Sequence, residues 1–269
     1  MDNRAIGVFD SGLGGLTVVR KLRELLEDEN IIYFGDTGRV PYGTKGTDTI
    51  CRYTGQDEAF LLSKDVKMII VACGTASSVA KSVTEKLSVP NVSVVQPTAK
   101  AAAAATRNGK IGVIGTEATV KSGSFKKALL SENKDLEIFS TACSLFVPLV
   151  EAGWVKDDDE VTVKAAERYL LPLKQKGIDT LILGCTHFPI ISGIIQRVMG
   201  DEVTLISSGA EAAKAAAELL EQRGMLCEGN LGKEEYFVSD DIPSFAKTAE
   251  IFLGRSINDS VEKINIEEY

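Results

Sequence analysis

The sequence predicts an α/β protein built from two similar three-layer domains, each with a mainly parallel sheet between layers of helices. Short apolar segments alternate with helix-length amphipathic stretches along nearly the whole chain of 269 residues, a pattern typical of parallel strands joined by crossover helices. A weak repeat also relates the two halves. Ile-Gly-Val occurs at 6–8 and again at 111–113, and each copy precedes an apolar segment that ends in a cysteine, Cys73 or Cys185.

Eight segments are expected to be strands, because they are short, apolar and rich in β-branched residues, as buried parallel strands are. In chain order they are Ala5–Phe9, Ile31–Phe34, Lys67–Ala72, Asn91–Val95, Lys110–Ile114, Leu136–Ser140, Thr180–Leu183 and Val203–Ile206.

Four intervening stretches are expected to be helices. Residues 16–26 and 161–173 repeat apolar side chains at helical spacing, and the alanine-rich stretches Ala99–Ala105 and Ala212–Ala217 are strong helix formers.

The repeat predicts the domain boundaries. The first domain is expected to contain residues 1–97 and 207–269, and the second residues 98–206, with 208–223 returning the chain to the first. The end of the chain, 255–269, is expected to be a short last helix or a frayed tail.

Composition excludes several classes of protein. The 30 Lys and Arg residues are outnumbered by 38 Asp and Glu, giving a net charge of −8, so the basic surface that nucleic acids require is not expected. No leader-like segment or long apolar span is present, which argues against secretion and membrane insertion and favours the cytoplasm. The five cysteines are odd in number and form no C-x-x-C pair, so we expect free thiols rather than disulfides or a metal site.

Cys73 and Cys185 each end an apolar strand, where open parallel sheets bind their ligands. Backbone N–H groups at the start of the next helix are expected to lower the pKa of each thiol. Two thiols on facing domains suit a reaction that removes a proton from one face of a carbon acid and returns one to the other face. Cys51, Cys143 and Cys227 lack this setting and are expected to have no catalytic role.

Two further side chains lie near these strand ends. His187, the only histidine, follows Cys185 by two residues and could relay protons or position a ligand. Asp10 ends the first strand and could bind an ammonium group, assist a thiol or cap a helix. The glycine-rich turn 11–15 does not match G-x-G-x-x-G, and 38–45 lacks the order of a phosphate loop, so no nucleotide cofactor is expected.

Six motifs together resemble the glutamate racemase family. They occur in the family's order over nearly the whole chain, and they are Gly7–Gly15, Gly35–Thr37, Pro41–Gly43, Ala72–Ala76, Leu145–Glu151 and Gly184–Pro189.

The resemblance implies two flavodoxin-like domains with the active site in the cleft between them. It implies a homodimeric racemase, without cofactor or metal, that interconverts L- and D-glutamate and supplies D-glutamate for peptidoglycan. By motif position, Cys73 would act on the D-glutamate side and Cys185 on the L-glutamate side. Asp10, Glu151 and His187 would assist them. The residues that would line the substrate are Asp10, Ser11, Tyr42, Gly43, Gly74, Thr75, Thr116, Thr119, Thr186 and His187.

The chain departs from the family pattern at three positions. Gly74 stands where asparagine is usual, Ser207 where aspartate is usual, and Phe125 where tyrosine is common. The first departure removes a side chain beside Cys73, which could alter substrate affinity or selectivity.

Three other functions remain open at this point. A two-cysteine racemase for aspartate or another small amino acid would differ only in its pocket. A cysteine-dependent hydrolase or decarboxylase would use Cys185 and His187 and leave Cys73 dispensable. A binding protein would close two domains on a small ligand without chemistry.

Overall fold

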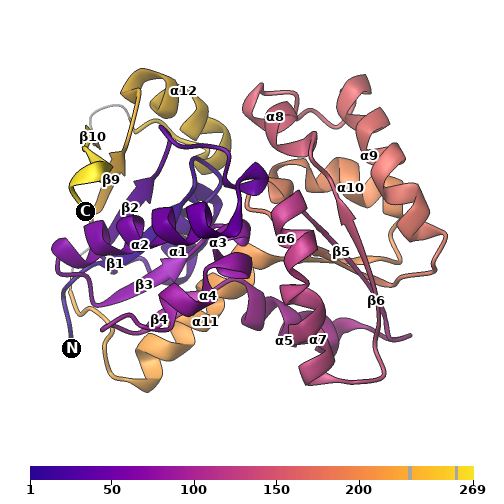
Figure 1. Ribbon diagram of the computed structural model, residues 1–269, viewed down its shortest axis with the longest axis horizontal. Helices are drawn as coiled ribbons and strands as arrows, with labels where there is room; N and C mark the ends of the chain where they lie inside the picture. Colours follow the sequence, from indigo (N-terminus) through magenta and orange to yellow (C-terminus); the bar gives the residue numbers. More distant parts are fainter. Residues whose placement is uncertain (230–231, 258–259) are drawn as a thin grey trace.

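A computed structural model describes residues 1–229, 232–257 and 260–269 and divides them into two lobes, each built around one parallel sheet (Figure 1). The first sheet has the strand order β10-β9-β2-β1-β3-β4, and the second has the order β6-β5-β7-β8. The strands are β1 (Ile6–Asp10), β2 (Ile31–Gly35), β3 (Met68–Val71), β4 (Asn91–Ser93), β5 (Lys110–Gly115), β6 (Glu137–Ala142), β7 (Thr180–Leu183), β8 (Thr204–Ser207), β9 (Glu234–Val238) and β10 (Val261–Lys263).

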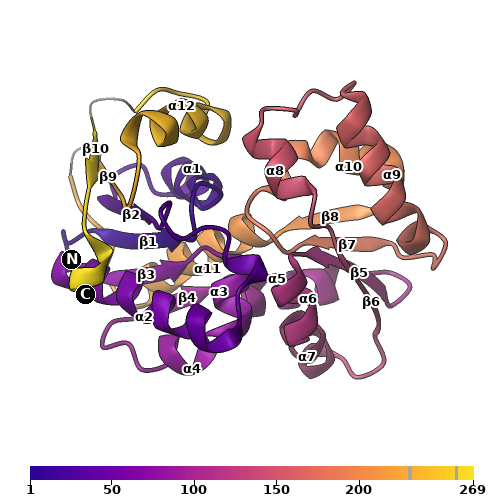
Figure 2. The same cartoon turned by 45° about the horizontal axis from the view of Figure 1, so that its top comes forward.

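Helices connect the strands and cover both faces of each sheet, as Figures 1 and 2 show. The α-helices are α1 (Leu16–Leu25), α2 (Thr47–Ser63), α3 (Gly74–Val79), α4 (Lys81–Thr84), α5 (Val95–Ala105), α6 (Glu117–Ser122), α7 (Ser124–Glu132), α8 (Phe146–Glu151), α9 (Glu160–Lys174), α10 (Ser192–Met199), α11 (Ser208–Gln222) and α12 (Ile242–Leu253). Three short 3-10 helices are η1 (Tyr42–Thr44), η2 (Phe188–Ile191) and η3 (Ile266–Glu268).

The two lobes share one topology, which confirms the predicted α/β fold and explains the sequence repeat. The order β2-β1-β3-β4 in the first sheet matches β6-β5-β7-β8 in the second, and all these neighbours pair in parallel. The two Ile-Gly-Val segments lie in the corresponding strands β1 and β5. Cys73 and Cys185 therefore follow corresponding strands, β3 and β7, at the carboxyl edges of the two sheets.

The eight predicted strands are all present, with ends within two residues of those expected. The prediction that 255–269 forms a short last helix or a frayed tail is wrong in part, because this segment contains the strand β10. The β10 strand pairs with β9, which extends the first sheet beyond β2, and the short helix η3 follows β10. Residues 258–259 of that segment lie outside the described residues.

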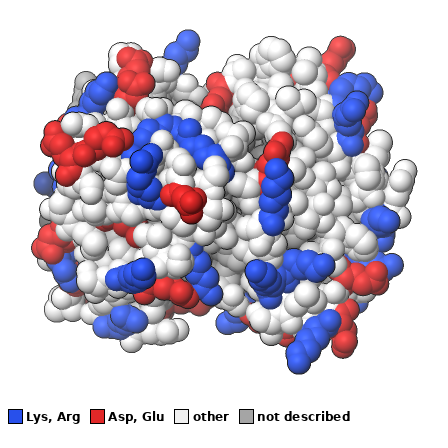
Figure 3. All heavy atoms as spheres, viewed as in Figure 1, with Lys and Arg blue, Asp and Glu red and all other residues white. Residues whose placement is uncertain are grey.

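Helix α11 and helix α12 both return to the first lobe. The α11 helix packs against α1 and also contacts α5, so it lies along the junction between the lobes. The α12 helix lies beside α1, and Figure 2 shows it facing α8 of the second lobe across the top of the molecule. On the face drawn in Figure 3, acidic and basic side chains are interspersed over both lobes.

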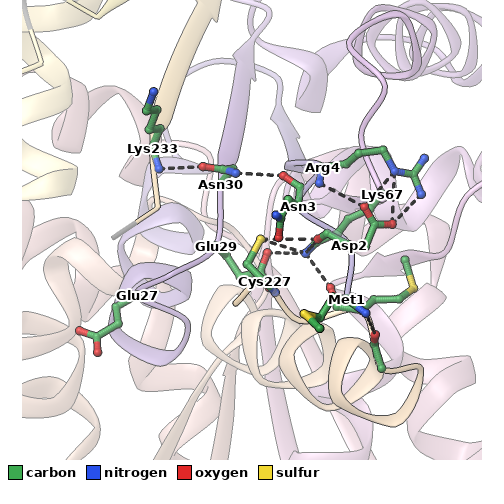
Figure 4. Close-up of polar contacts among 12 residues, drawn as sticks. Met1, Asp2, Asn3, Arg4, Glu27, Glu29, Asn30, Lys67, Cys227 and Lys233 are labelled. Atoms are coloured by element: carbon green, nitrogen blue, oxygen red, sulfur yellow. Dashed lines mark hydrogen bonds and ion pairs between the residues drawn. The ribbon is translucent and has the colours of Figure 1, made fainter. Parts of the chain in front are cut away.

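A buried ion pair ties three distant segments together at the amino end of β3 (Figure 4). The Lys67 side chain is 0% exposed, and its Nζ lies 2.6 Å from Oε2 of Glu29. The same ammonium donates hydrogen bonds to the carbonyl oxygens of Asp2 and Met225, each at 2.7 Å. Lys67 thus fixes the N-terminal segment and the segment after α11 to the first sheet.

We expect Lys67→Ala to destabilise the protein strongly. The substitution leaves the Glu29 carboxylate buried without its cation, and breaking a buried pair in this way raises the free energy of the folded state by about 3–5 kcal/mol. Urea unfolding would measure the change. Lys81→Ala is the control, because Lys81 forms an exposed pair with Glu85 whose loss changes stability by about 0–1 kcal/mol. A Lys67→Ala protein as stable as this control would contradict the expectation.

Candidate active site

A cavity of about 290 Å³ lies between the lobes, where the carboxyl ends of strands from both sheets meet. Its walls come from the loops that follow β1, β3, β5, β6 and β7, together with η1 and α8. The lining residues are Asp10, Ser11, Gly12, Val40, Pro41, Tyr42, Gly43, Thr44, Cys73, Gly74, Thr75, Thr116, Glu117, Cys143, Ser144, Val147, Pro148, Glu151, Cys185, Thr186 and His187. The structure therefore brings together all of the predicted site residues except Thr119.

Cys73 is the N-cap residue of α3. Its Sγ accepts a hydrogen bond from the Ala76 N–H at 3.4 Å and donates one to the Ser11 hydroxyl at 3.6 Å. Burial raises the pKa of this thiol to about 12, with a further contribution from the nearby Asp10 carboxylate, although hydrogen bonds that Ala76 and Ser11 can donate to the thiolate act in the opposite direction. The predicted lowering of the Cys73 pKa is therefore wrong, because desolvation outweighs the helix-start N–H groups.

We expect the alkylation of Cys73 by iodoacetamide to accelerate with pH far beyond neutrality. Only the thiolate reacts, and below a pKa of about 12 its fraction rises about tenfold with each pH unit. Peptide mass spectrometry after reaction at a series of pH values from neutral to strongly alkaline would give the rate, and a Cys73→Ser protein would identify the signal. A rate that levels off near neutral pH would contradict the high pKa.

Cys185, His187 and Glu151 form a line of polar contacts in the second lobe. The Cys185 Sγ lies 3.9 Å from Nδ1 of His187, and His187 Nε2 lies 2.9 Å from Oε1 of Glu151. Burial by itself would lower the pKa of His187, but the contacts with Cys185 and Glu151 outweigh burial and raise it to about 10. At neutral pH the ring is an imidazolium that donates to Glu151 and directs its second N–H toward the Cys185 sulfur.

The ring of His187 also contacts the first lobe. Phe252 of α12 packs against it edge-on, with 5.2 Å between the ring centroids. Since α12 belongs to the segment that returns to the first sheet, this contact helps to hold the imidazolium between the lobes.

Asp10 connects the two lobes from the end of β1. Its side chain is buried, accepts a hydrogen bond from the Gly12 N–H at 3.1 Å and accepts a weaker one from the Thr186 hydroxyl at 3.4 Å. Burial raises the pKa of Asp10, and the positive His187 opposes that rise. Asp10 is not the N-cap residue of α1, since Gly15 holds that position, but a hydrogen bond from the Gly15 backbone also acts to lower the pKa of Asp10.

Three of the four threonines predicted to line the substrate form one hydroxyl chain, whereas the Thr186 hydroxyl donates to Asp10. The Thr75 and Thr116 hydroxyls lie 3.0 Å apart across the lobes, and Thr116 donates to the Thr119 hydroxyl at 3.0 Å. Thr119 thus lies behind Thr116 and orients it rather than lining the cavity. Tyr42 lines the cavity, but its hydroxyl is bonded to Asp36 and Asp57 beneath η1.

The family departure at Gly74 coincides with a close approach of the two cysteine loops. A Cβ atom built on Gly74 would lie 2.2 Å from the carbonyl oxygen of Gly184, so no side chain fits in this arrangement. Of the other departures, Ser207 caps α11 by accepting a hydrogen bond from the Ala210 N–H, and Phe125 is buried beneath Gly184. Neither of these two residues lines the cavity.

Cys143 is a site residue that the sequence reasoning missed. It lines the cavity, and burial, followed by the proximity of Cys185, raises the pKa of its thiol. The expected strand stopped at Ser140, whereas β6 continues to Ala142, so Cys143 directly follows the end of a strand. It therefore occupies the same kind of position as Cys73 and Cys185, and the correct strand end would have revealed it.

Cys51 and Cys227 lie outside the cavity, as expected. Within the described ranges, no group of three or more His, Cys, Asp or Glu side chains is arranged to hold a metal ion. In the same residues, no helix has both the length and the apolar character needed to cross a membrane.

Comparison with known proteins places the chain in a class. Residues 6–216 match the model of the Asp/Glu/Hydantoin racemase family. The chain belongs to this family, which confirms the resemblance drawn from the six motifs.

Three similar proteins are all glutamate racemases. The glutamate racemase of Geobacter metallireducens is 44% identical over 98% of this chain and 97% of its own length. That of Streptococcus gordonii is 45% identical over 99% of this chain and 100% of its own. The crystal structure of Francisella tularensis glutamate racemase in complex with D-glutamate superimposes with a TM-score of 0.93 at 35% identity, and the match covers 100% of both chains.

Proposed function

We propose that the protein is a glutamate racemase that interconverts L- and D-glutamate and supplies D-glutamate for peptidoglycan. The observation that carries the proposal is the pair of thiols, Cys73 and Cys185, that reach one buried cavity from corresponding strand ends of two similar lobes. Full-length similarity to glutamate racemases supports glutamate as the substrate.

The reaction moves one proton at each face of the substrate. With L-glutamate bound, the Cys185 sulfur as thiolate takes the α-proton, and the Cys73 thiol gives its proton to the opposite face of the carbanion, which produces D-glutamate. The reverse reaction uses the same groups in exchanged roles. The high pKa of Cys73 suits the donor role, since it keeps this thiol protonated in the empty site.

The remaining polar groups assist the two thiols. The His187 imidazolium, held by Glu151, stabilises negative charge on the Cys185 sulfur. Asp10 lies near Cys73 and balances the ammonium group of the substrate. Hydrogen bonds to the two substrate carboxylates come from hydroxyl and backbone groups of the cavity wall. These groups are Ser11, the backbone of Tyr42 and Gly43, the backbone N–H of Gly74, and the hydroxyls of Thr75, Thr116 and Thr186, with Thr119 orienting Thr116.

The proposal extends to the organisation of the protein. Two units close on the substrate, consistent with the division into two sheets. The first contains residues 1–97 and 207–269, and the second contains residues 98–206. We further propose a homodimer that acts in the cytoplasm, where a reducing environment suits the five free cysteines.

Incubation of the purified protein with L-glutamate in deuterium oxide tests this function. D-glutamate with deuterium at the α-carbon is expected, since the proton that is returned comes from a thiol in exchange with solvent. A parallel incubation with L-aspartate provides the comparison. Exchange and inversion of aspartate but not of glutamate would reject glutamate as the substrate, and the absence of inversion with both would reject the reaction.

A further inference from the structure

One wall of the cavity is a short strap, residues 40–44, that reaches from the first lobe to the second. All five of its residues line the cavity. A Cβ atom built on Gly43 would lie 2.7 Å from Cβ of Thr116, so the strap backbone touches the residue that caps α6. Its only regular structure is the single turn η1, so its position must be fixed by contacts beneath it.

Those contacts form a buried cluster of Asp36, Arg39, Tyr42 and Asp57. Both carboxyl groups are 0% exposed. The Arg39 guanidinium donates from Nε to Oδ2 of Asp36 at 2.7 Å and from Nη2 to Oδ1 of Asp57 at 3.1 Å. The Tyr42 hydroxyl lies 2.5 Å from Oδ2 of Asp36 and 2.8 Å from Oδ2 of Asp57. Arg39 and Tyr42 thus anchor the strap at one end and in its middle.

The hydroxyl contacts require a proton on one of the carboxyl groups. A tyrosine hydroxyl has a single hydrogen, so Tyr42 donates to only one of the two carboxyl oxygens that lie within bonding distance. The second contact needs a donor on the carboxyl side. Burial, followed by the charge of Asp36, raises the pKa of Asp57 well above its usual range, so Asp57 carries that proton. Asp57 then donates to Tyr42, Tyr42 donates to Asp36, and the charges of Asp36 and Arg39 cancel.

The C-terminal segment completes the cluster. The Ser239 hydroxyl donates to Oδ1 of Asp36 and accepts from the Gly38 N–H, both at 2.8 Å. Glu267 of η3 lies 3.3 Å from the Arg39 guanidinium. Asp36 therefore accepts hydrogen bonds on both of its oxygens, as a charged carboxylate does.

We propose that Asp36, Arg39 and Asp57 are positioning residues that, with Tyr42, share one proton and hold the strap where its backbone binds the substrate. This inference rests on the proposed function. Among the described hydrogen bonds, none joins residues 40–44 to the Cys73 or Cys185 sulfur, so we expect the strap, and the cluster beneath it, to act on substrate binding in the ground state and transition state alike rather than on the proton transfers. Its disruption should therefore raise KM and leave kcat nearly unchanged.

Two matched substitutions, Asp36→Asn and Asp57→Asn, test the proposal. The amide introduced by Asp57→Asn would keep both contacts, because its N–H replaces the carboxyl proton and its oxygen still accepts from Arg39. We expect the KM of this variant for L-glutamate to stay within about threefold of the wild-type value. The Asp36→Asn substitution would leave Arg39 without its counter-charge. It would also place an amide N–H against a group that donates to Asp36 in the wild type, so two donors would face each other. We expect KM to rise about tenfold or more, with kcat changed less than about threefold.

Infrared spectroscopy gives a readout that does not depend on activity. The spectrum of the wild type at neutral pH minus that of Asp57→Asn should show the carbonyl band of a buried protonated carboxyl group. Glu58, whose pKa is raised to about 8 by burial, contributes to both proteins and so cancels in the difference.

A third substitution controls for the loss of an ion pair that does not touch the strap. Arg23 forms a partly buried pair with Glu234 at 2.8 Å and lies outside the cavity wall. The KM of Arg23→Lys should equal that of the wild type.

Several outcomes would overturn the inference. These are equal KM values for Asp36→Asn and Asp57→Asn, a lower kcat at unchanged KM in Asp36→Asn, or a difference spectrum without the carboxyl band. If thermal melting shows that Asp36→Asn does not fold, Arg39→Lys, which keeps the charge but loses the forked contacts, must show the same rise in KM. If the wild type inverts another amino acid but not glutamate, the proposed substrate fails, and the same KM comparison on that amino acid still decides the role of the cluster.

Discussion

Replacing Cys73 with alanine is expected to reduce racemisation of glutamate by about 10²–10⁴-fold while leaving a slow exchange of the α-proton of L-glutamate. The loss follows because the carbanion formed on the Cys185 side has no donor on its opposite face. Exchange persists because Cys185 can remove the α-proton and return a deuteron to the same face. Proton NMR in deuterium oxide, combined with chiral chromatography, separates exchange from inversion.

Cys185→Ala is the mirror experiment and should lose racemisation to the same extent while keeping exchange of D-glutamate only. Cys51→Ala is the control, since Cys51 lies outside the cavity. Full turnover in Cys73→Ala would reject the two-thiol mechanism and favour a reaction that depends on Cys185 and His187 alone.

Replacing Gly74 with alanine is expected to reduce kcat/KM by about 10²-fold. The new Cβ would lie 2.2 Å from the carbonyl oxygen of Gly184, and non-bonded atoms cannot approach so closely, so the loops that carry Cys73 and Cys185 must separate. A displacement of about 1 Å between reacting groups is enough for a loss of this size. Stability should change much less, because a local shift of the two loops relieves the contact without exposing buried apolar side chains. Steady-state kinetics and thermal melting would measure the two effects.

Gly55→Ala is the matched control for this substitution. Gly55 lies within α2, and a Cβ there would meet only a side-chain carbon of Val83 at 3.6 Å, an ordinary contact. Alanine in a helix interior stabilises by about 0.5–1 kcal/mol relative to glycine, so activity should be unchanged and the melting temperature slightly higher. Wild-type kinetics in Gly74→Ala would show that the close approach of the loops is unimportant.

Much of the fold could be predicted because the strands buried in each sheet carry a strong apolar signal. The segment Ile6–Asp10 is buried at every position, and its repeat at 111–113 revealed the second lobe. The strand β9 begins with Glu234 and Glu235, and β10 places two charged residues among three at the edge of the sheet. These two strands lack the apolar pattern of a buried strand. They can be identified only from the strands they pair with in the folded protein, which the sequence alone does not show.

The candidate site could be predicted where residues are close to a strand end in sequence, as with Asp10, Cys73 and Cys185. The positioning cluster under the strap could not be predicted, because Asp36 and Asp57 meet only after β2 and α2 have folded together. The protonation of the Cys73 thiol was also beyond reach. The number of nearby N–H groups can be inferred from a motif, but the loss of water around a sulfur depends on the whole cavity.

The order in which the chain visits the two sheets has a consequence for its synthesis. Strands β5 to β8 follow one another between residues 110 and 207, so the second lobe has all its strands early. The first sheet, by contrast, receives β9 and β10 only from residues 234–263, after the strands of the second lobe have been synthesised. Until then β2 has an unpaired edge, which is a template for pairing with other chains. A prematurely terminated chain would therefore carry a complete second sheet and an aggregation-prone first one.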